Sequence, residues 1–128
     1  MIHENLTNQI LAACFEVSND LGAGFLESVY QNALMLALKT KELEVEREFP
    51  LSVFFRGEIV GQFFADILVE RKIIIELKAV TALTDIHKAQ VINYLKATGV
   101  EVGLLVNFGN PKLEYRRFEN RFKKGETM

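Results

Sequence analysis

The amino-acid sequence predicts a protein of the α/β class in the broad sense, an α+β arrangement with a mixed β-sheet flanked by helices. Two segments near the N-terminus carry apolar residues at every third or fourth position, which is typical of amphipathic helices. The middle of the chain contains short runs rich in β-branched and aromatic residues, which indicate strands. A third helical segment separates the last apolar runs, and such a crossover allows two strands to run parallel. For 128 residues we expect one domain over 1–128, with its core at about 5–118 and a basic end at 119–128.

The first predicted helix covers about residues 6–21, with Asn5 as its N-cap. Cys14 lies on the apolar stripe of this helix, so we expect its thiol to be a core group rather than a reactive nucleophile. Gly22 and Gly24 then break the helical pattern, which predicts a tight connection to the next element.

The second predicted helix covers about residues 26–41 and begins with Glu27 and Tyr30 in its first turn. A carboxylate at a helix N-terminus is favoured by the helix macrodipole, so Glu27 has an ordinary structural explanation. Tyr30 taken alone is most simply a core or rim aromatic residue. The pattern of this helix by itself therefore assigns neither residue a function.

The predicted sheet begins with residues 43–49, where apolar and charged residues alternate as in a half-exposed edge strand. Pro50 is expected to interrupt this strand before residues 51–55 continue it. A central hairpin follows over residues 61–79, because two apolar runs flank a short polar loop centred on Arg71. The strands from 43 to 79 therefore form an antiparallel meander.

The central hairpin brings charged groups together on strands that are otherwise apolar. Centring its loop on Arg71 places Asp66 opposite Glu76, with Cβ atoms about 4.5–5.5 Å apart. Lys78 lies two residues after Glu76, so both side chains point to the same side of the sheet. The sequence predicts a small patch of two carboxylates and one ammonium group.

This patch needs a compensating interaction, since two like charges face to face on a buried strand are destabilising. A divalent cation would remove the conflict, and carboxylate oxygens suit Mg²⁺. Alternatively Lys78 bridges the acids in a structural ion pair, or the register slips and Asp66 points to water. The spacing of these residues leaves the three possibilities open.

The third predicted helix begins after Thr84, as its N-cap, and ends before Gly99. Val102–Asn107 and Leu113–Phe118 are the last two predicted strands, and the first of them should run parallel to residues 73–79. One polar stripe along the helix faces either solvent or the charged patch, and it consists of His87, Gln90 and Tyr94.

Composition and charge limit the class of protein. The net charge of −2 excludes a protein dominated by nonspecific attraction to phosphate, so any basic contacts must be local. A single cysteine excludes an internal disulfide and suits a reducing compartment. We find no signal-peptide pattern and no apolar run long enough to cross a bilayer, so we expect a cytoplasmic protein without a membrane partner. The basic C-terminal residues either solubilise the chain or contact phosphates, and they are Arg116, Arg117, Arg121, Lys123 and Lys124.

The order Asp66 … Glu76-Leu77-Lys78 resembles the signature of the PD-(D/E)xK nucleases, although Ala65 stands where the family usually has Pro. The stretch Gly24-Phe25-Leu26-Glu27-Ser28-Val29-Tyr30 resembles the motif that names the GxxExxY family, a small bacterial and archaeal group within that superfamily. Further blocks of the same family are similar to residues 65–69, 75–79, 90–95 and 103–108, and the resemblance spans about residues 5–118 in the same order.

The resemblance implies a restriction-endonuclease-like αβββαβ core and metal-dependent hydrolysis of phosphodiesters in DNA, with RNA as the other option. Lys78 would position and activate the attacking water and stabilise developing charge. Gln90 and Tyr94 match a QxxxY element that supports the site, and His87 and Tyr30 would support it from nearby. The implied ligands for Mg²⁺ or Mn²⁺ are Asp66, Glu76, the backbone carbonyl of Leu77, and Glu27.

A different class of function remains open, because fold and activity separate readily. The chain could be a catalytically silent nuclease-fold protein that binds nucleic acid or acts as an assembly module. It is also small for an enzyme that must grip a duplex, so a homodimer or a larger protein partner is expected.

Overall fold

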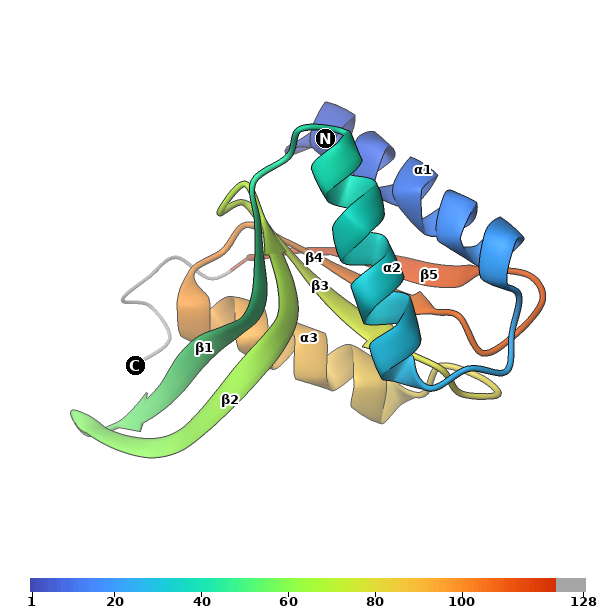
Figure 1. The fold of residues 1–128 in the computed structure, drawn as a ribbon. Helices are drawn as coiled ribbons and strands as arrows, with labels where there is room; N and C mark the ends of the chain where they lie inside the picture. The colour runs from blue at the N-terminus through green and yellow to red at the C-terminus, as the bar shows by residue number, and fades with distance from the viewer. Residues whose placement is uncertain (122–128) are drawn as a thin grey trace.

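The computed structural model describes residues 1–121, and within them three helices and a five-stranded mixed sheet form an α+β fold (Figure 1). The spatial order of the strands is β1-β2-β3-β4-β5; only β3 and β4 run parallel, and the other neighbours are antiparallel. The predicted fold class is confirmed. The elements are α1 (Glu4–Leu21), α2 (Glu27–Thr40), β1 (Val45–Phe55), β2 (Glu58–Val69), β3 (Ile73–Lys78), α3 (Asp85–Thr98), β4 (Val102–Asn107) and β5 (Glu114–Glu119).

Helices cover both faces of the central strands, with α1 and α2 on one face and α3 on the other (Figure 1). The larger core lies under α1 and α2 and includes Ile67, Ile75 and Leu104. The smaller core lies under α3 and includes Leu68 and Ile74. Neighbouring strand residues thus enter opposite cores, which explains why β3 reads as an almost continuous apolar run.

The two N-terminal helices begin close to where the sequence predicts, but the first cap differs. Helix α1 starts at Glu4 with His3 in the N-cap position, so the prediction of Asn5 as the N-cap is wrong. The carbonyl of His3 accepts a 2.8 Å hydrogen bond from the Thr7 N–H, which extends the helix beyond Asn5. The burial of Cys14 in the core between the helices and the sheet agrees with its place on the apolar stripe.

Strands β1 and β2 form a long hairpin that reaches away from the rest of the molecule (Figure 1). The predicted interruption at Pro50 is wrong, since Pro50 is paired with Phe64 inside one continuous strand. Strand β1 lies at the edge of the sheet, which is where proline is found within β-sheets. The turn residues Arg56 and Gly57 both have positive φ angles, 52° and 79°, as a two-residue hairpin turn with the natural strand twist requires.

The central hairpin has the register that the sequence predicts. Ile67 pairs with Ile75 and Val69 pairs with Ile73, across a turn in which Glu70 and Arg71 have positive φ. Within β2 only Ile67, Leu68 and Val69 pair with β3, and the earlier residues of β2 pair with β1 alone. This separation of two neighbouring strands is the feature on which the site is built.

Helix α3 starts after Thr84 and ends before Gly99, whose φ of 76° completes a left-handed C-terminal cap, so both predicted boundaries are confirmed. Strand β4 returns parallel to β3, also as predicted. At Gly103 a Cβ atom would lie 2.6 Å from Val91 Cγ1, so the glycine lets α3 pack closely on β4. Among the described residues, no helix combines the length and apolar character needed to span a bilayer.

Candidate active site at the separation of β2 and β3

Two carboxyl groups occupy the point where β2 leaves β3. Glu76 Oε1 accepts a 2.9 Å hydrogen bond from the Asp66 backbone N–H, and Asp66 Oδ2 accepts a 2.8 Å hydrogen bond from the Leu77 backbone N–H. Each carboxyl group thus binds the backbone of the opposite strand, where a regular ladder would use carbonyl oxygens. The possibility that Asp66 points to water through a slipped register is excluded by these contacts.

Burial makes this pair of acids unfavourable when both are ionised. Glu76 is only 3% exposed, and burial together with the charge of Asp66 raises the pKa of Glu76 to about 8. Burial also raises the pKa of Asp66, and the negative charge of Glu27 adds to this effect. The Leu77 N–H and the ammonium of Lys78 oppose the rise in the pKa of Asp66 without cancelling it. When both acids are ionised, the site therefore holds excess negative charge in a poorly hydrated place.

Lys78 is anchored from the facing helix. Its Nζ donates to Gln90 Oε1 at 3.1 Å, and Gln90 Nε2 donates to the hydroxyl of Tyr94 at 3.1 Å. The positive charge of Lys78 lowers the pKa values of both Asp66 and Glu76, so its ammonium lies within electrostatic range of the two acids. Of the two alternatives for the polar stripe on α3, Gln90 and Tyr94 lie on the side that faces the patch.

Tyr94 is buried, and its phenol is held in the neutral form. Burial raises the pKa of Tyr94, and the negative charge of Glu76 raises it further. The hydrogen bond from Gln90 acts in the opposite direction. A neutral phenol that accepts from Gln90 fixes the amide, so Tyr94 supports the contact between Gln90 and Lys78.

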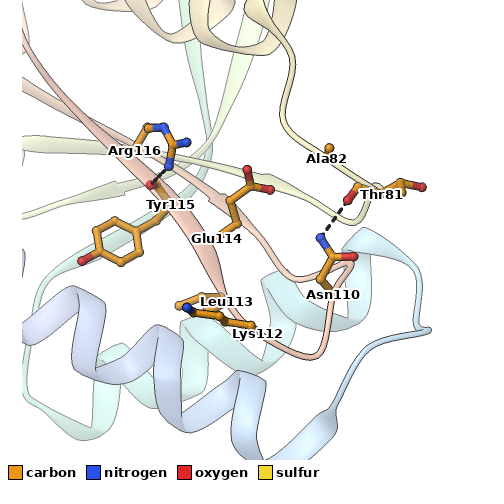
Figure 2. A pocket seen from close by; sticks show the side chains of 8 residues that line it. All are labelled: Thr81, Ala82, Asn110, Lys112, Leu113, Glu114, Tyr115 and Arg116. Carbon is orange, nitrogen blue, oxygen red and sulfur yellow. Dashed lines mark hydrogen bonds between the residues drawn. The ribbon is translucent and has the colours of Figure 1, made fainter.

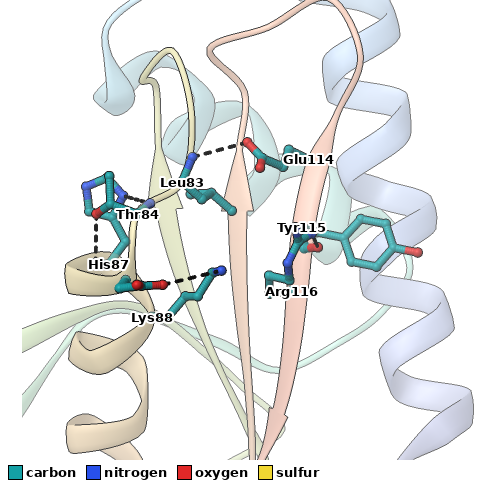
Figure 3. Close-up of polar contacts among 8 residues, drawn as sticks. Leu83, Thr84, His87, Lys88, Glu114, Tyr115 and Arg116 are labelled. Carbon is teal, nitrogen blue, oxygen red and sulfur yellow. Dashed lines mark hydrogen bonds and ion pairs between the residues drawn. The ribbon is translucent and has the colours of Figure 1, made fainter.

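His87, the third residue of the stripe, lies at the beginning of α3 (Figure 3). Its backbone N–H donates to Thr84 Oγ1 at 3.3 Å, and its Nδ1 accepts from the Thr84 N–H at 3.1 Å, which together form a capping box. The structure therefore gives His87 a capping role, and its support of the site remains a prediction.

Glu27 and Tyr30 are both placed by the start of α2. Glu27 is exposed in the first turn and acts on Asp66 through its charge, while its role as a ligand remains a prediction. Tyr30 is fully buried, its ring stacks on Phe108 at 4.9 Å, and its hydroxyl donates to the Gly22 carbonyl at 2.6 Å. Tyr30 thus ties the loop before α2 to the core and supports Glu27 through the backbone.

Gln31 is a site residue that sequence reasoning missed. Its Nε2 donates to the Asp66 backbone carbonyl at 3.0 Å, and its Oε1 accepts from Arg47 Nη2 at 3.4 Å. Gln31 is buried one turn after Glu27 on α2, so the helix holds the backbone of Asp66 directly. The only signal in the sequence is a polar residue four positions after Glu27, on the same face of the helix.

The basic residues predicted to contact nucleic acid differ in their surroundings. Arg117 is tied down by Glu119 Oε2 at 2.6 Å and by the Ile2 carbonyl, so its guanidinium has a structural role. Arg116 is exposed and lines a surface depression of about 680 Å³, together with Lys112 (Figure 2). Arg121 is exposed, and the remaining predicted residues, Lys123 and Lys124, lie outside the described part of the chain.

A hydrogen-bonded link connects this depression to the strand beside Lys78. Asn107 is the β4 partner of Lys78, and its Nδ2 donates to Glu114 Oε1 at 3.1 Å. Glu114 is the first residue of β5, and its Oε1 also accepts a 3.3 Å hydrogen bond from the Leu83 N–H in the loop after β3 (Figure 3). The depression is thus one strand away from the candidate site.

The donor set at the separation of β2 and β3 fits a hard divalent cation. Two carboxyl groups converge there, and the burial and repulsion that raise their pKa values would be relieved by a bound cation. In residues 1–121 the side chains of His, Cys, Asp and Glu form no cluster of three or more suited to a metal ion. A cation here would take two carboxylates, a backbone carbonyl and water, which is a usual arrangement for Mg²⁺.

Comparisons with known proteins agree with this architecture. The family model described as "PD-(D/E)XK nuclease superfamily" matches residues 4–118, which is most of the chain. A solved structure described as "Crystal structure of SSO0001" is similar in fold, with a TM-score of 0.59 and 19% sequence identity. The similarity covers 94% of this chain and 61% of that chain, so this protein spans less than two thirds of the length of that structure. The search of curated proteins gave no match. From the match to the family model, we conclude that this chain belongs to the PD-(D/E)XK nuclease superfamily.

Proposed function

We propose that the protein is a metal-dependent nuclease that hydrolyses phosphodiester bonds in DNA, within the GxxExxY group of the superfamily. The observation that supports this most is the convergence of three groups at one point. The Asp66 and Glu76 carboxyl groups meet where β2 and β3 separate, and the Lys78 ammonium, held by Gln90 at 3.1 Å, acts on both acids through its charge. A structural ion pair would need only one carboxylate and one ammonium group, whereas this site has two carboxyl groups for its one ammonium group.

Asp66, Glu76 and the Leu77 carbonyl would hold Mg²⁺ or Mn²⁺, with Glu27 contributing from α2 directly or through water. When bound, such a cation polarises a phosphate oxygen and lowers the pKa of a coordinated water. The two hydrogen bonds from the Asp66 and Leu77 N–H groups orient the carboxyl groups, so little rearrangement of the strands is needed for ligation.

Lys78 would supply the positive charge that faces the substrate. The Lys78 ammonium is suited to stabilising negative charge on the phosphate in the transition state. Gln90 limits the rotation of the Lys78 side chain, and Tyr94 limits the rotation of Gln90. The chain of contacts from β3 to α3 therefore preorganises the ammonium.

Nucleic acid would be held by local basic groups rather than by net charge. Arg116 and Lys112, on the depression one strand away from Lys78, are the best-placed cations for phosphate contacts in the described residues. Lys123 and Lys124 extend the same basic end in the sequence.

A cleavage assay tests the proposal. Single- and double-stranded DNA and RNA are incubated with the protein in Mg²⁺, in Mn²⁺ and in a chelator. We expect cleavage that requires metal, and a loss on the order of 10²–10³-fold in Lys78→Ala. Lys72→Ala is the matched control, because Lys72 is exposed at the opposite end of β3. Equal cleavage by both variants, or cleavage in the chelator, would contradict the proposal.

A silent binding or assembly protein is the second candidate. It is favoured by the absence, among residues 1–121, of three acidic, His or Cys side chains gathered as a metal site, and by the backbone contacts that both carboxyl groups already make. This candidate predicts nucleic-acid binding that is unchanged by Lys78→Ala and no product with any metal. Turnover that depends on Lys78 excludes it.

A further inference from the structure

The outer part of the β1–β2 hairpin, residues 53–64, is here called the hairpin arm. It extends beyond the body of the protein, away from the other strands (Figure 1). Its large apolar side chains are between 45% and 62% exposed, and they are Phe54, Phe55, Ile59, Val60, Phe63 and Phe64. Four aromatic rings and two aliphatic side chains on one projecting element form an unusually apolar surface for a soluble domain.

Apolar residues occupy both faces of the hairpin arm. Phe54 shares a face with Pro50, and Pro50 pairs with Phe64, so the two phenylalanines lie on one face. Phe63 and Phe55 lie on the other face, where Tyr94 of α3 covers the base of the arm through a 5.9 Å ring contact with Phe63. Within residues 1–121, packing on α3 reaches this base alone, so the described part of the fold does not explain the other exposed apolar side chains of the arm.

The exposed apolar area is close to what one partner contributes to a stable interface. A fully exposed aromatic side chain presents roughly 200 Å², so the six half-exposed side chains together present on the order of 600 Å². A standard interface takes about 800 Å² from each partner. The polar residues at the edges of the arm and the residues next to it can supply the remaining interface area.

The charges at the end of the arm fit a symmetric contact. Arg56 and Glu58 carry opposite charges on the two sides of the turn, and the Arg56 guanidinium lies over the Phe55 ring at 4.9 Å from its centroid. A twofold contact must be complementary to itself, and this surface offers one cation and one anion to an identical copy. Binding grooves for single-stranded nucleic acid combine aromatic residues with several cationic side chains. Residues 53–64 contain one cationic side chain, that of Arg56.

We propose that a second copy of this chain covers the hairpin arm, so that the protein is a homodimer joined through the apolar faces of its two arms. The contact uses the faces of the arm, because the exposed apolar side chains lie on those faces. Phe64 lies two residues before Asp66 on β2, so the dimer would hold the two candidate sites in one assembly. The dimer itself does not depend on catalysis, and only this last consequence depends on the proposed function.

Sedimentation velocity of the full chain over low to high micromolar concentrations tests the proposal. We expect the mass of two chains in the wild type, and a rise of about 30-fold or more in the dissociation constant of Phe54→Asp/Phe64→Asp. Leu36→Asp is the matched control, because it places the same charge at an exposed apolar residue of α2 outside the arm. Circular dichroism shows whether each variant is folded, and Val60→Asp replaces the double variant if that one is not.

The outcomes distinguish a second copy of the chain from other possible binding partners of the hairpin arm. A wild-type dimer that the arm variants dissociate and Leu36→Asp leaves intact supports the proposal. A wild-type monomer at all concentrations overturns it, as does a dimer that is equally stable in the arm variants. A monomer whose affinity for single-stranded DNA falls in the arm variants also overturns it and assigns the aromatic residues to base stacking.

Discussion

The Glu76 carboxyl group accepts the backbone N–H of Asp66 at 2.9 Å, in a place where a regular antiparallel ladder would present a carbonyl oxygen. Asp66 returns the contact through the N–H of Leu77 at 2.8 Å. Two strands therefore separate without leaving these N–H groups unpaired, and the same contacts hold two acids face to face. Their unfavourable charge when ionised, which a divalent cation would relieve, is a consequence of this local geometry.

Without a divalent cation, the free energy of unfolding should fall as the pH rises from about 5 to about 9. The folded-state pKa of Glu76, about 8, lies above its ordinary value of 4.5, so the protonated acid favours the folded state. This contribution is fully present below about pH 4.5 and is lost as the pH rises through about 8. Urea unfolding in a chelator at several pH values measures it.

Glu76→Gln is the control for this pH dependence, because it keeps the shape of the side chain and removes its titration. We expect a flatter profile in the variant, and in the wild type a larger stabilisation by Mg²⁺ at about pH 8 than at about pH 5, since ligation needs the ionised carboxylate. A wild-type profile in the chelator that is as flat as that of Glu76→Gln would show that burial does not raise this pKa.

Gln90→Ala should reduce kcat more than it changes KM. The substitution removes the 3.1 Å contact that holds the Lys78 ammonium, so the charge is still present but no longer preorganised. We expect a loss of about 10- to 100-fold in kcat, and less than about 10-fold in Tyr94→Phe, which removes only the hydroxyl behind Gln90. Unchanged kcat in Gln90→Ala would show that Lys78 needs no anchor.

Gly109→Ala should destabilise the fold strongly. A Cβ atom there would overlap the backbone of Val80, and neither segment can move freely because Asn107 Oδ1 accepts from the N–H groups of both Val80 and Gly109, at 3.0 and 2.9 Å. We expect a loss of about 2 kcal/mol or more in the free energy of unfolding.

Gly61→Ala is the matched substitution for this comparison, since its Cβ would meet only the exposed Phe63 ring, at 3.0 Å. That ring can rotate away, so we expect a loss below about 1 kcal/mol. Chemical denaturation of both variants measures the difference, and equal losses would mean that the loop after β4 is less constrained than its contacts indicate.

Cys14 should be unreactive in the folded protein. Burial raises the pKa of its thiol to about 12, so almost no thiolate is present at neutral pH, and the sulfur is enclosed by the core. A thiol reagent should label the native protein far more slowly than the protein in urea. Rapid labelling under native conditions would show that α1 opens readily from the sheet.

The register of the central hairpin could be predicted from the sequence because alternation along a strand has a period of two, and the loop around Arg71 fixes the centre. The facing of Asp66 and Glu76 follows from that register. The boundaries of α3 could be predicted because Thr84 and Gly99 have strong local preferences.

Features that depend on tertiary contact could not be predicted in this way. Gln31 is recognisable only once α2 is known to pack against the Asp66 carbonyl. Helical spacing groups His87 with Gln90, but the hydrogen bonds of His87 to Thr84, one through its backbone and one through its imidazole, decide its position. Local sequence preferences predict that Pro50 ends its strand, whereas in the structure the strand continues through Pro50 because it lies at the edge of the sheet.

The dependence of DNA cleavage on Mg²⁺ concentration, measured for the wild type and for Asp66→Asn, tests the central claim most directly. Asn keeps the size of the side chain and removes the charge that would hold the cation. The account predicts saturable, Mg²⁺-dependent cleavage in the wild type and a loss on the order of 10³-fold in Asp66→Asn. Cleavage by Asp66→Asn at the wild-type rate and the same Mg²⁺ dependence would contradict it.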